Sequence, residues 1–112
     1  MAGWFNVVPE TELLPGQAKL VDVDNVMIAV FNVGGEYHAI EDVCTHDGSP
    51  MLGCGLEPER VIDGAEIICP RHGARFCVKT GDALTPPAYE PTTTFPVRVE
   101  NGMIQVTDDR WD

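Results

Sequence analysis

The chain has 112 residues, 44% of them hydrophobic, and its 7 Lys and Arg stand against 18 Asp and Glu for a net charge of −11. This length suits one small domain with a modest core, so we expect residues 1–112 to form a single domain. The negative charge disfavours nucleic acid as a partner, because phosphates repel an acidic surface, and it suits partners with basic docking surfaces.

No apolar run approaches the ~20 residues that a membrane helix needs. The N-terminal residues also lack a basic region and a long apolar stretch. The sequence therefore predicts no signal peptide and no membrane anchor, and a cytoplasmic location is expected. In that reducing compartment the four cysteines are expected to serve metal binding or redox chemistry in preference to disulfide bonding.

Short runs rich in Val, Ile and Phe alternate with turn residues along the chain, which predicts an all-β sandwich or barrel. One helical turn is expected over residues 9–14, before a Pro-Gly pair. Hairpin turns are expected at Asp24-Asn25, Gly34-Gly35, Asp63-Gly64 and Asn101-Gly102. The expected strands, in chain order, are Trp4–Val8, Ala18–Val23, Val26–Val33, Tyr37–Ile40, Arg60–Ile62, Glu66–Ile68, Arg75–Val78, Phe95–Val99 and Met103–Val106.

Two short segments are the strongest candidates for a functional site. They are Cys44-Thr45-His46 and Cys69-Pro70-Arg71-His72, with 22 residues between them. Each follows an expected strand and opens a loop, so a rigid β-scaffold can hold the two segments side by side. Together they offer two thiolates and two imidazoles, which is a complete four-ligand set for a metal centre.

Several interpretations of this set compete. Mononuclear zinc accepts both ligand types, but zinc motifs commonly place two to four residues between paired ligands, and Cys44 and His46 have one between them. An all-cysteine cluster would also need Cys54 and Cys77, and the gaps of 9, 14 and 7 residues do not match the plant-type run. A purely structural role would require two Cys/His pairs to fall on two loops by chance. A [2Fe-2S] cluster, with two Cys on one iron and two His on the other, fits the spacing best.

The two segments resemble the ligand loops of the Rieske [2Fe-2S] family, in particular the soluble ferredoxins that serve bacterial ring-hydroxylating oxygenases. The resemblance extends through residues 75–84, 86–88 and 95–99, and covers nearly the whole chain. It implies a Rieske-type antiparallel β-sandwich with the cluster-binding subdomain at one tip. It also implies that one iron is bound by Cys44 and Cys69, that the other is bound by His46 and His72, and that a third loop over the cluster carries Pro86 and Pro87.

One departure from those ferredoxins is a longer segment before Cys69, around residues 53–59, which leaves the partner open. High-potential Rieske proteins carry a disulfide between the ligand loops, and a Ser and a Tyr that donate hydrogen bonds toward the cluster. By the resemblance, those positions are occupied here by Ser49, Arg71, Ala74 and Phe76. Hydrogen bonds to cluster sulfur stabilise the reduced state, so we predict a potential near the bottom of the Rieske range, roughly −150 mV.

The sequence shows no nucleophile–base pair and no phosphate-binding glycine loop, so we expect an electron carrier and not an enzyme. The resemblance implies one [2Fe-2S] cluster that carries one electron at a time from a flavin reductase to a terminal oxygenase, in a monomeric protein. Two alternatives stay open. One is a Rieske small subunit or partner of another redox enzyme, such as a nitrite reductase or a cluster-assembly system. The other is a redox or iron sensor.

Four further residues have simple expected roles. We expect Cys77 to be a buried core thiol and Cys54 to be exposed in a Gly-rich loop. His38 is expected to be an ordinary surface or packed residue. Asp47, beside His46, is expected to be a loop acid that is either solvated or steers a basic partner.

Overall fold

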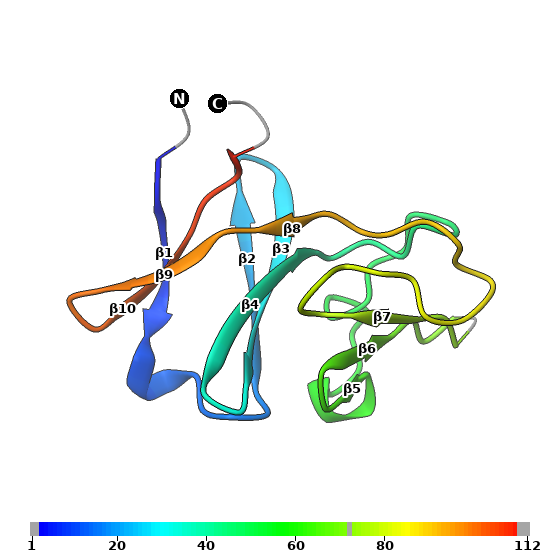
Figure 1. The fold of residues 1–112 in the computed structure, drawn as a ribbon, viewed down its shortest axis with the longest axis horizontal. Helices are drawn as coiled ribbons and strands as arrows, with labels where there is room; N and C mark the ends of the chain where they lie inside the picture. The colour runs from blue at the N-terminus through cyan, green and yellow to red at the C-terminus, as the bar shows by residue number, and fades with distance from the viewer. Residues whose placement is uncertain (1–2, 72, 110–112) are drawn as a thin grey trace.

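Antiparallel strands make up most of the ordered structure (Figure 1). The computed structural model describes residues 3–71 and 73–109. Its elements are β1 (Phe5–Pro9), the 3-10 turn η1 (Glu10–Glu12), β2 (Ala18–Val23), β3 (Val26–Val33), β4 (Glu36–Glu41), the 3-10 turn η2 (Pro58–Arg60), β5 (Ile62–Asp63), β6 (Glu66–Ile68), β7 (Arg75–Cys77), β8 (Thr94–Phe95), β9 (Val97–Glu100) and β10 (Met103–Val106).

The strands form three sheets, ordered β1-β10-β9, β2-β3-β4-β8 and β5-β6-β7, and every pairing is antiparallel. The first two sheets lie together, and the small β5-β6-β7 sheet stands to one side with the long loops around it (Figure 1). This arrangement confirms the expected all-β antiparallel fold with a smaller subdomain. No helix among the described residues is long and apolar enough to span a bilayer.

The hairpin between β2 and β3 shows how local sequence sets the strand ends. Asp24 and Asn25 both have positive φ angles, 50° and 70°, which a two-residue hairpin turn requires. The side chain of Asp22 accepts a hydrogen bond from the backbone N–H of Asn25 at 2.8 Å. Val23 then pairs with Val26, and the ladder continues to Ala18 and Phe31.

Strand β3 joins the two halves of the hydrophobic core because both of its faces are buried. Successive side chains of a strand point to opposite sides. Ile28 and Val30 pack in the core cluster between the two larger sheets. Ala29 and Phe31 point the other way, into a second cluster that contains the inward-facing residues of the small sheet and the loop cysteines. The cysteine loops therefore rest on the same strand that organises the larger sheets.

Two expected strands differ from the observed ones by more than one residue at an end, and in both cases proline is the cause. The run expected as one strand over Phe95–Val99 is divided at Pro96, which has no N–H to donate to a ladder. Its first part, β8, pairs with β4, and its second part, β9, pairs with β10. The strand expected over Arg60–Ile62 starts later, because Pro58 begins the 3-10 turn η2 instead.

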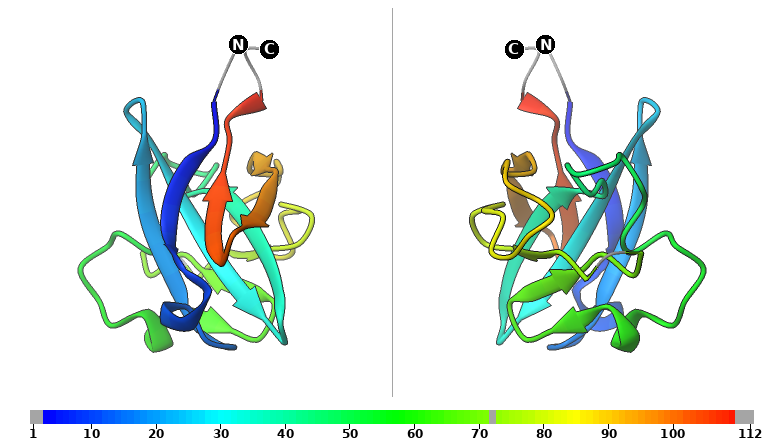
Figure 2. Two further views of the ribbon diagram at one scale, coloured as in Figure 1. Left: turned by 90° about the vertical axis from the view of Figure 1, so that its left-hand side faces the viewer. Right: turned by 90° about the vertical axis from the view of Figure 1, so that its right-hand side faces the viewer.

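The two ends of the described chain lie side by side (Figure 2). Phe5 in β1 pairs with Val106 in β10. The hydroxyl of Thr107 donates a hydrogen bond to the carbonyl of Gly3 at 2.8 Å. Both ends therefore leave the fold from the β1-β10-β9 sheet, away from the loops around the small sheet (Figure 1).

Candidate metal centre

The first cysteine loop, residues 44–49, is a tight turn closed on Cys44. The backbone N–H of Cys44 donates to the carbonyl of Ser49 at 2.8 Å, and the N–H of Gly48 donates to the carbonyl of Cys44 at 2.7 Å. Gly48 has a φ of +78°, a conformation that favours glycine. These bonds fix the backbone that carries the Cys44 sulfur.

The second cysteine loop, which begins at Cys69, repeats this pattern. The N–H of Cys69 donates to the carbonyl of Ala74 at 2.7 Å, and the N–H of Gly73 donates to the carbonyl of Cys69 at 2.8 Å. Gly73 has a φ of +75°. The two loops therefore present their cysteines from the same kind of turn, one from the end of β4 and one from the β6–β7 hairpin.

The two turns bring Cys44 and Cys69 together. Both residues are fully buried, and their sulfurs and a carboxylate oxygen of Asp47 all lie within 4.8 Å of one another. Burial raises the pKa of the Cys44 thiol, backbone N–H groups at His46 and Asp47 lower it, and the adjacent Cys69 raises it again, for a net increase. A thiol such as that of Cys44, which burial keeps from ionising alone, becomes a thiolate when a metal supplies positive charge, so the pair of buried sulfurs fits a metal–sulfur centre.

Of the two predicted histidine ligands, the structure describes only His46. His46 is exposed, and its ring nitrogens are not part of the donor group formed by Cys44, Asp47 and Cys69 among the residues that the structure describes. It lines a shallow hollow with Thr45, Pro87, Tyr89 and Glu90. His72 lies outside the described residues. The structure therefore brings together the two sulfur donors and places one of the two imidazoles at the surface beside them.

Asp47 has a position that the sequence did not reveal. Its side chain is 25% exposed, and one carboxylate oxygen accepts a hydrogen bond from the N–H of Ser49 at 3.0 Å. The other oxygen lies 3.8 Å from Nε of Arg71, on the second cysteine loop. Asp47 thus links the two loops and places a carboxylate beside both sulfurs. Its place next to His46 was the only available signal.

A third segment, residues 84–90, is held against both cysteine loops. The Thr45 hydroxyl donates to the carbonyl of Glu90 at 2.6 Å, which ties the segment to the first loop. The N–H of Leu84 donates to the carbonyl of Arg75 at 2.8 Å, and the N–H of Arg75 donates to the hydroxyl of Thr85 at 2.9 Å. These anchors hold Pro87 in the hollow beside His46, where the resemblance expects a covering loop.

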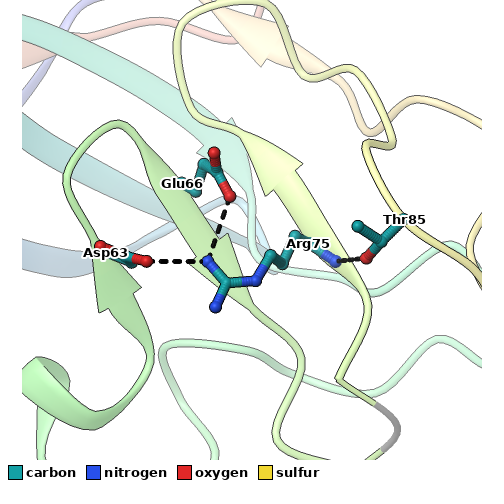
Figure 3. A network of polar contacts seen from close by, with 4 residues as sticks. All are labelled: Asp63, Glu66, Arg75 and Thr85. Carbon is teal, nitrogen blue, oxygen red and sulfur yellow. Dashed lines mark hydrogen bonds and ion pairs between the residues drawn. The ribbon is translucent and has the colours of Figure 1, made fainter.

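Arg75 also braces the small sheet (Figure 3). Its Nη1 atom lies 2.9 Å from a carboxylate oxygen of Asp63 and 3.2 Å from one of Glu66. The hydrogen bonds that Arg75 donates to these two carboxylates raise its pKa. Because Asp63 is on β5, Glu66 on β6 and Arg75 on β7, one guanidinium connects all three strands. The backbone N–H of the same residue holds the third segment through Thr85.

None of the four cysteines takes part in a disulfide. Cys77 was expected to be a buried core thiol, and this prediction is wrong: Cys77 is only half-buried. On the short strand β7 the side chains alternate, and Phe76 takes the fully buried position. Cys54 was expected to be exposed, and this prediction is also wrong: Cys54 is half-buried and packs against the core cluster beneath the loops.

Fold and site together define a small antiparallel β protein with two matched cysteine loops at one tip. A family model described as Rieske [2Fe-2S] domain matches residues 3–96. The 3-phenylpropionate/cinnamic acid dioxygenase ferredoxin subunit of Escherichia coli (strain K12) is 47% identical over 96 residues, which are 86% of this chain and 85% of that protein. The chain therefore belongs to the Rieske [2Fe-2S] family.

Solved structures agree with this assignment. A chain of the complex of reduced oxygenase and oxidized ferredoxin in carbazole 1,9a-dioxygenase is 33% identical, with a TM-score of 0.80 and coverage of 92% of this chain and 91% of that chain. Sphingomonas yanoikuyae B1 ferredoxin is 27% identical, with a TM-score of 0.79 and coverage of 95% and 99%. The expected family, its single [2Fe-2S] cofactor and the role of electron carrier, as opposed to enzyme, are thereby confirmed.

Proposed function

We propose that this protein carries electrons from a flavin reductase to the terminal oxygenase of a ring-hydroxylating dioxygenase. The observation that carries the proposal is the pair of buried cysteines, Cys44 and Cys69, whose sulfurs lie within 4.8 Å on two matched loops. The relative with 47% identity is named as a dioxygenase ferredoxin subunit, and the 33% identical neighbour comes from an oxygenase–ferredoxin complex. These relatives favour a dioxygenase system over a nitrite reductase partner or a sensor.

Within this proposal, the cluster ligands are Cys44, His46, Cys69 and His72. The bound cluster supplies one-electron chemistry at a potential that its ligands and surroundings set. The two cysteines hold the buried iron, and their backbone turns keep both sulfurs in place. The exposed position of His46 supports an electron path through the imidazole side of the site.

The surroundings of the site suit transient docking. Tyr89, which shares the hollow with His46, is 81% exposed, and Leu56 and Leu84 on neighbouring loops are 42% and 46% exposed. The net charge of −11 supports partners with basic docking surfaces, because opposite charges accelerate encounter. We further propose that the protein works in the cytoplasm as a monomer and that residues 1–112 form one domain.

The ligand assignment is tested by electron paramagnetic resonance (EPR) of the reduced protein. A mixed Cys/His cluster is expected to give a lower average g value than an all-cysteine cluster. His46→Cys is expected to raise that average, whereas His38→Cys, a change of the half-buried histidine on β4, is expected to leave it unchanged. An all-cysteine type spectrum in the wild-type protein, or stoichiometric zinc with no signal, would contradict the assignment.

The partner assignment is tested by reconstitution. The protein is mixed with a flavin reductase, NADH and the terminal oxygenase of a 3-phenylpropionate-type dioxygenase, and product formation is measured. We expect turnover that depends on this protein and falls as salt rises, because docking is electrostatic. Turnover that proceeds equally well with Cys69→Ser, or no electron transfer to any oxygenase despite an intact cluster, would refute the proposed role.

A further inference from the structure

Asp42 is a buried carboxylate directly after β4, two residues before Cys44, and it is only 2% exposed. Its Oδ1 atom accepts hydrogen bonds from the backbone N–H groups of Met51 at 3.2 Å and Leu52 at 2.6 Å. Its Oδ2 atom accepts one from Gly53 at 2.9 Å. The carboxylate thus takes three consecutive N–H groups from the segment that follows the first cysteine loop.

The backbone of the same residue is tied to the larger sheet. The N–H of Asp42 donates to the carbonyl of Met27 on β3 at 2.9 Å. The chain leaves the sheet at Asp42, and after the first cysteine loop residues 51–53 come back to the carboxylate of Asp42, so one residue holds the segments on both sides of the loop. Between these two segments, the hydrogen bond from the N–H of Cys44 to the carbonyl of Ser49 closes the turn.

A carboxylate suits this position for a chemical reason. It accepts hydrogen bonds at both oxygens and donates none, whereas an Asn amide would direct its NH2 group against one set of backbone donors. Burying a charge is costly unless hydrogen bonds compensate for it, and three N–H donors do so here. No contact of Asp42 with the donor atoms of the site is needed for this role.

We infer that Asp42 is a positioning residue for the cluster: its hydrogen bonds set where the first cysteine loop stands relative to the sheet. The inference rests on the proposed assignment of Cys44 as a cluster ligand. The spectrum of the wild-type protein tests that assignment separately, so a failure of one can be told from a failure of the other.

Gly53 offers a way to disturb the same contact without changing the charge. A Cβ at Gly53 would lie 3.2 Å from Oδ2 of Asp42 and 3.0 Å from Cδ2 of Leu20, so a methyl group must push the carboxylate or its neighbours aside. The backbone there has no positive φ, so alanine is compatible with the local conformation. Asp42→Asn therefore alters charge and geometry, and Gly53→Ala alters geometry alone.

The experiment compares the cluster-loaded variants Asp42→Asn and Gly53→Ala with two controls. Asp22→Asn removes an exposed acid that caps a turn of the same sheet, and Gly3→Ala adds a methyl group where nothing lies within 4 Å. The readouts are the g values of the reduced protein by EPR, the midpoint potential, and the rate at which cluster absorbance is lost under a chelator. Circular dichroism checks that each variant is folded.

We expect shifted g values and about tenfold faster cluster loss in Asp42→Asn, with smaller changes of the same kind in Gly53→Ala, because hydrogen bonds to a charged group are displaced. The midpoint potential should change in Asp42→Asn by more than in Asp22→Asn, because the loop that Asp42 positions carries a cluster ligand. Wild-type g values, potential and cluster lifetime in a folded Asp42→Asn protein would overturn the inference. If Asp42→Asn does not fold, wild-type spectra and cluster lifetime in Gly53→Ala would overturn it instead.

Discussion

Replacing Asp47 with Asn is expected to raise the midpoint potential of the cluster. The carboxylate lies within 4.8 Å of both site sulfurs, and adding an electron to a centre beside a negative charge costs Coulomb energy. Asn has nearly the same shape and keeps an oxygen that can accept the 3.0 Å hydrogen bond from Ser49. The substitution therefore removes the charge while the turn of the first cysteine loop is retained.

The size of the shift follows from the distance. Two unit charges 4.8 Å apart interact by about 0.9 kcal/mol in a water-like dielectric and by about 3.5 kcal/mol at an effective dielectric constant of about 20. For one electron, about 1.4 kcal/mol corresponds to about 59 mV. Because the side chain is 25% exposed, solvent and salt weaken the interaction. We expect a rise of about 40 to 80 mV.

The assay is redox potentiometry monitored by the visible circular dichroism of the cluster, at two salt concentrations. Arg71→Gln removes the cation 3.8 Å from Asp47 and is expected to lower the potential, by less than Asp47→Asn raises it, since the Arg71 side chain is 66% exposed. Asp22→Asn, an exposed acid on β2, serves as the matched control for general surface charge. An Asp47→Asn potential equal to that of Asp22→Asn, or lower than wild type, would refute this electrostatic reasoning.

Three further predictions concern stability and reactivity. Ile104 is fully buried in the core between the larger sheets. Ile104→Ala should lower the free energy of unfolding by about 2 to 5 kcal/mol and leave the midpoint potential of the cluster unchanged. Arg75→Ala should lower the urea concentration at which half of the protein is unfolded, and this difference should shrink in high salt, because both ion pairs are partly exposed. Burial raises the pKa of the Cys77 thiol, but hydrogen bonds from Thr80 and the nearby backbone bring this pKa below its usual value. Thr80→Val should therefore slow the alkylation of Cys77 near neutral pH, and an unchanged alkylation rate would contradict this reasoning.

Strands whose ends are set by local turns could be predicted from the sequence. The observed bounds of β2, β3 and β10 match the predicted ones, because Asp24-Asn25 and Asn101-Gly102 form two-residue turns with positive φ angles at Asp24, Asn25, Asn101 and Gly102. The division at Pro96 was not predicted, because it depends on two different sheets capturing the two parts of one apolar run. Strand pairing of this kind is a tertiary property that a local pattern does not contain.

Some residues of the candidate site could likewise be predicted from the sequence, and others could not. Cys44 and Cys69 could be found from the sequence, since two Cys/His segments on loops are rare enough to suggest metal binding. Asp42 and Asp47 could not, because their importance lies in where a carboxylate points: one to the N–H groups of residues 51–53, the other to Arg71 and the two sulfurs. Acidic residues are abundant in this chain, so their number conceals the two that matter.

The hydrogen bond between Thr107 and Gly3 has a practical consequence for building electron-transfer chains. Both ends of the described chain emerge at one place, apart from the cysteine loops (Figure 2). A flexible tether at either end can therefore join this protein to another redox protein or to an electrode surface with the cysteine loops left uncovered. Such a fusion would replace a diffusional encounter with a high effective concentration of the donor, which a short linker sets in the millimolar range.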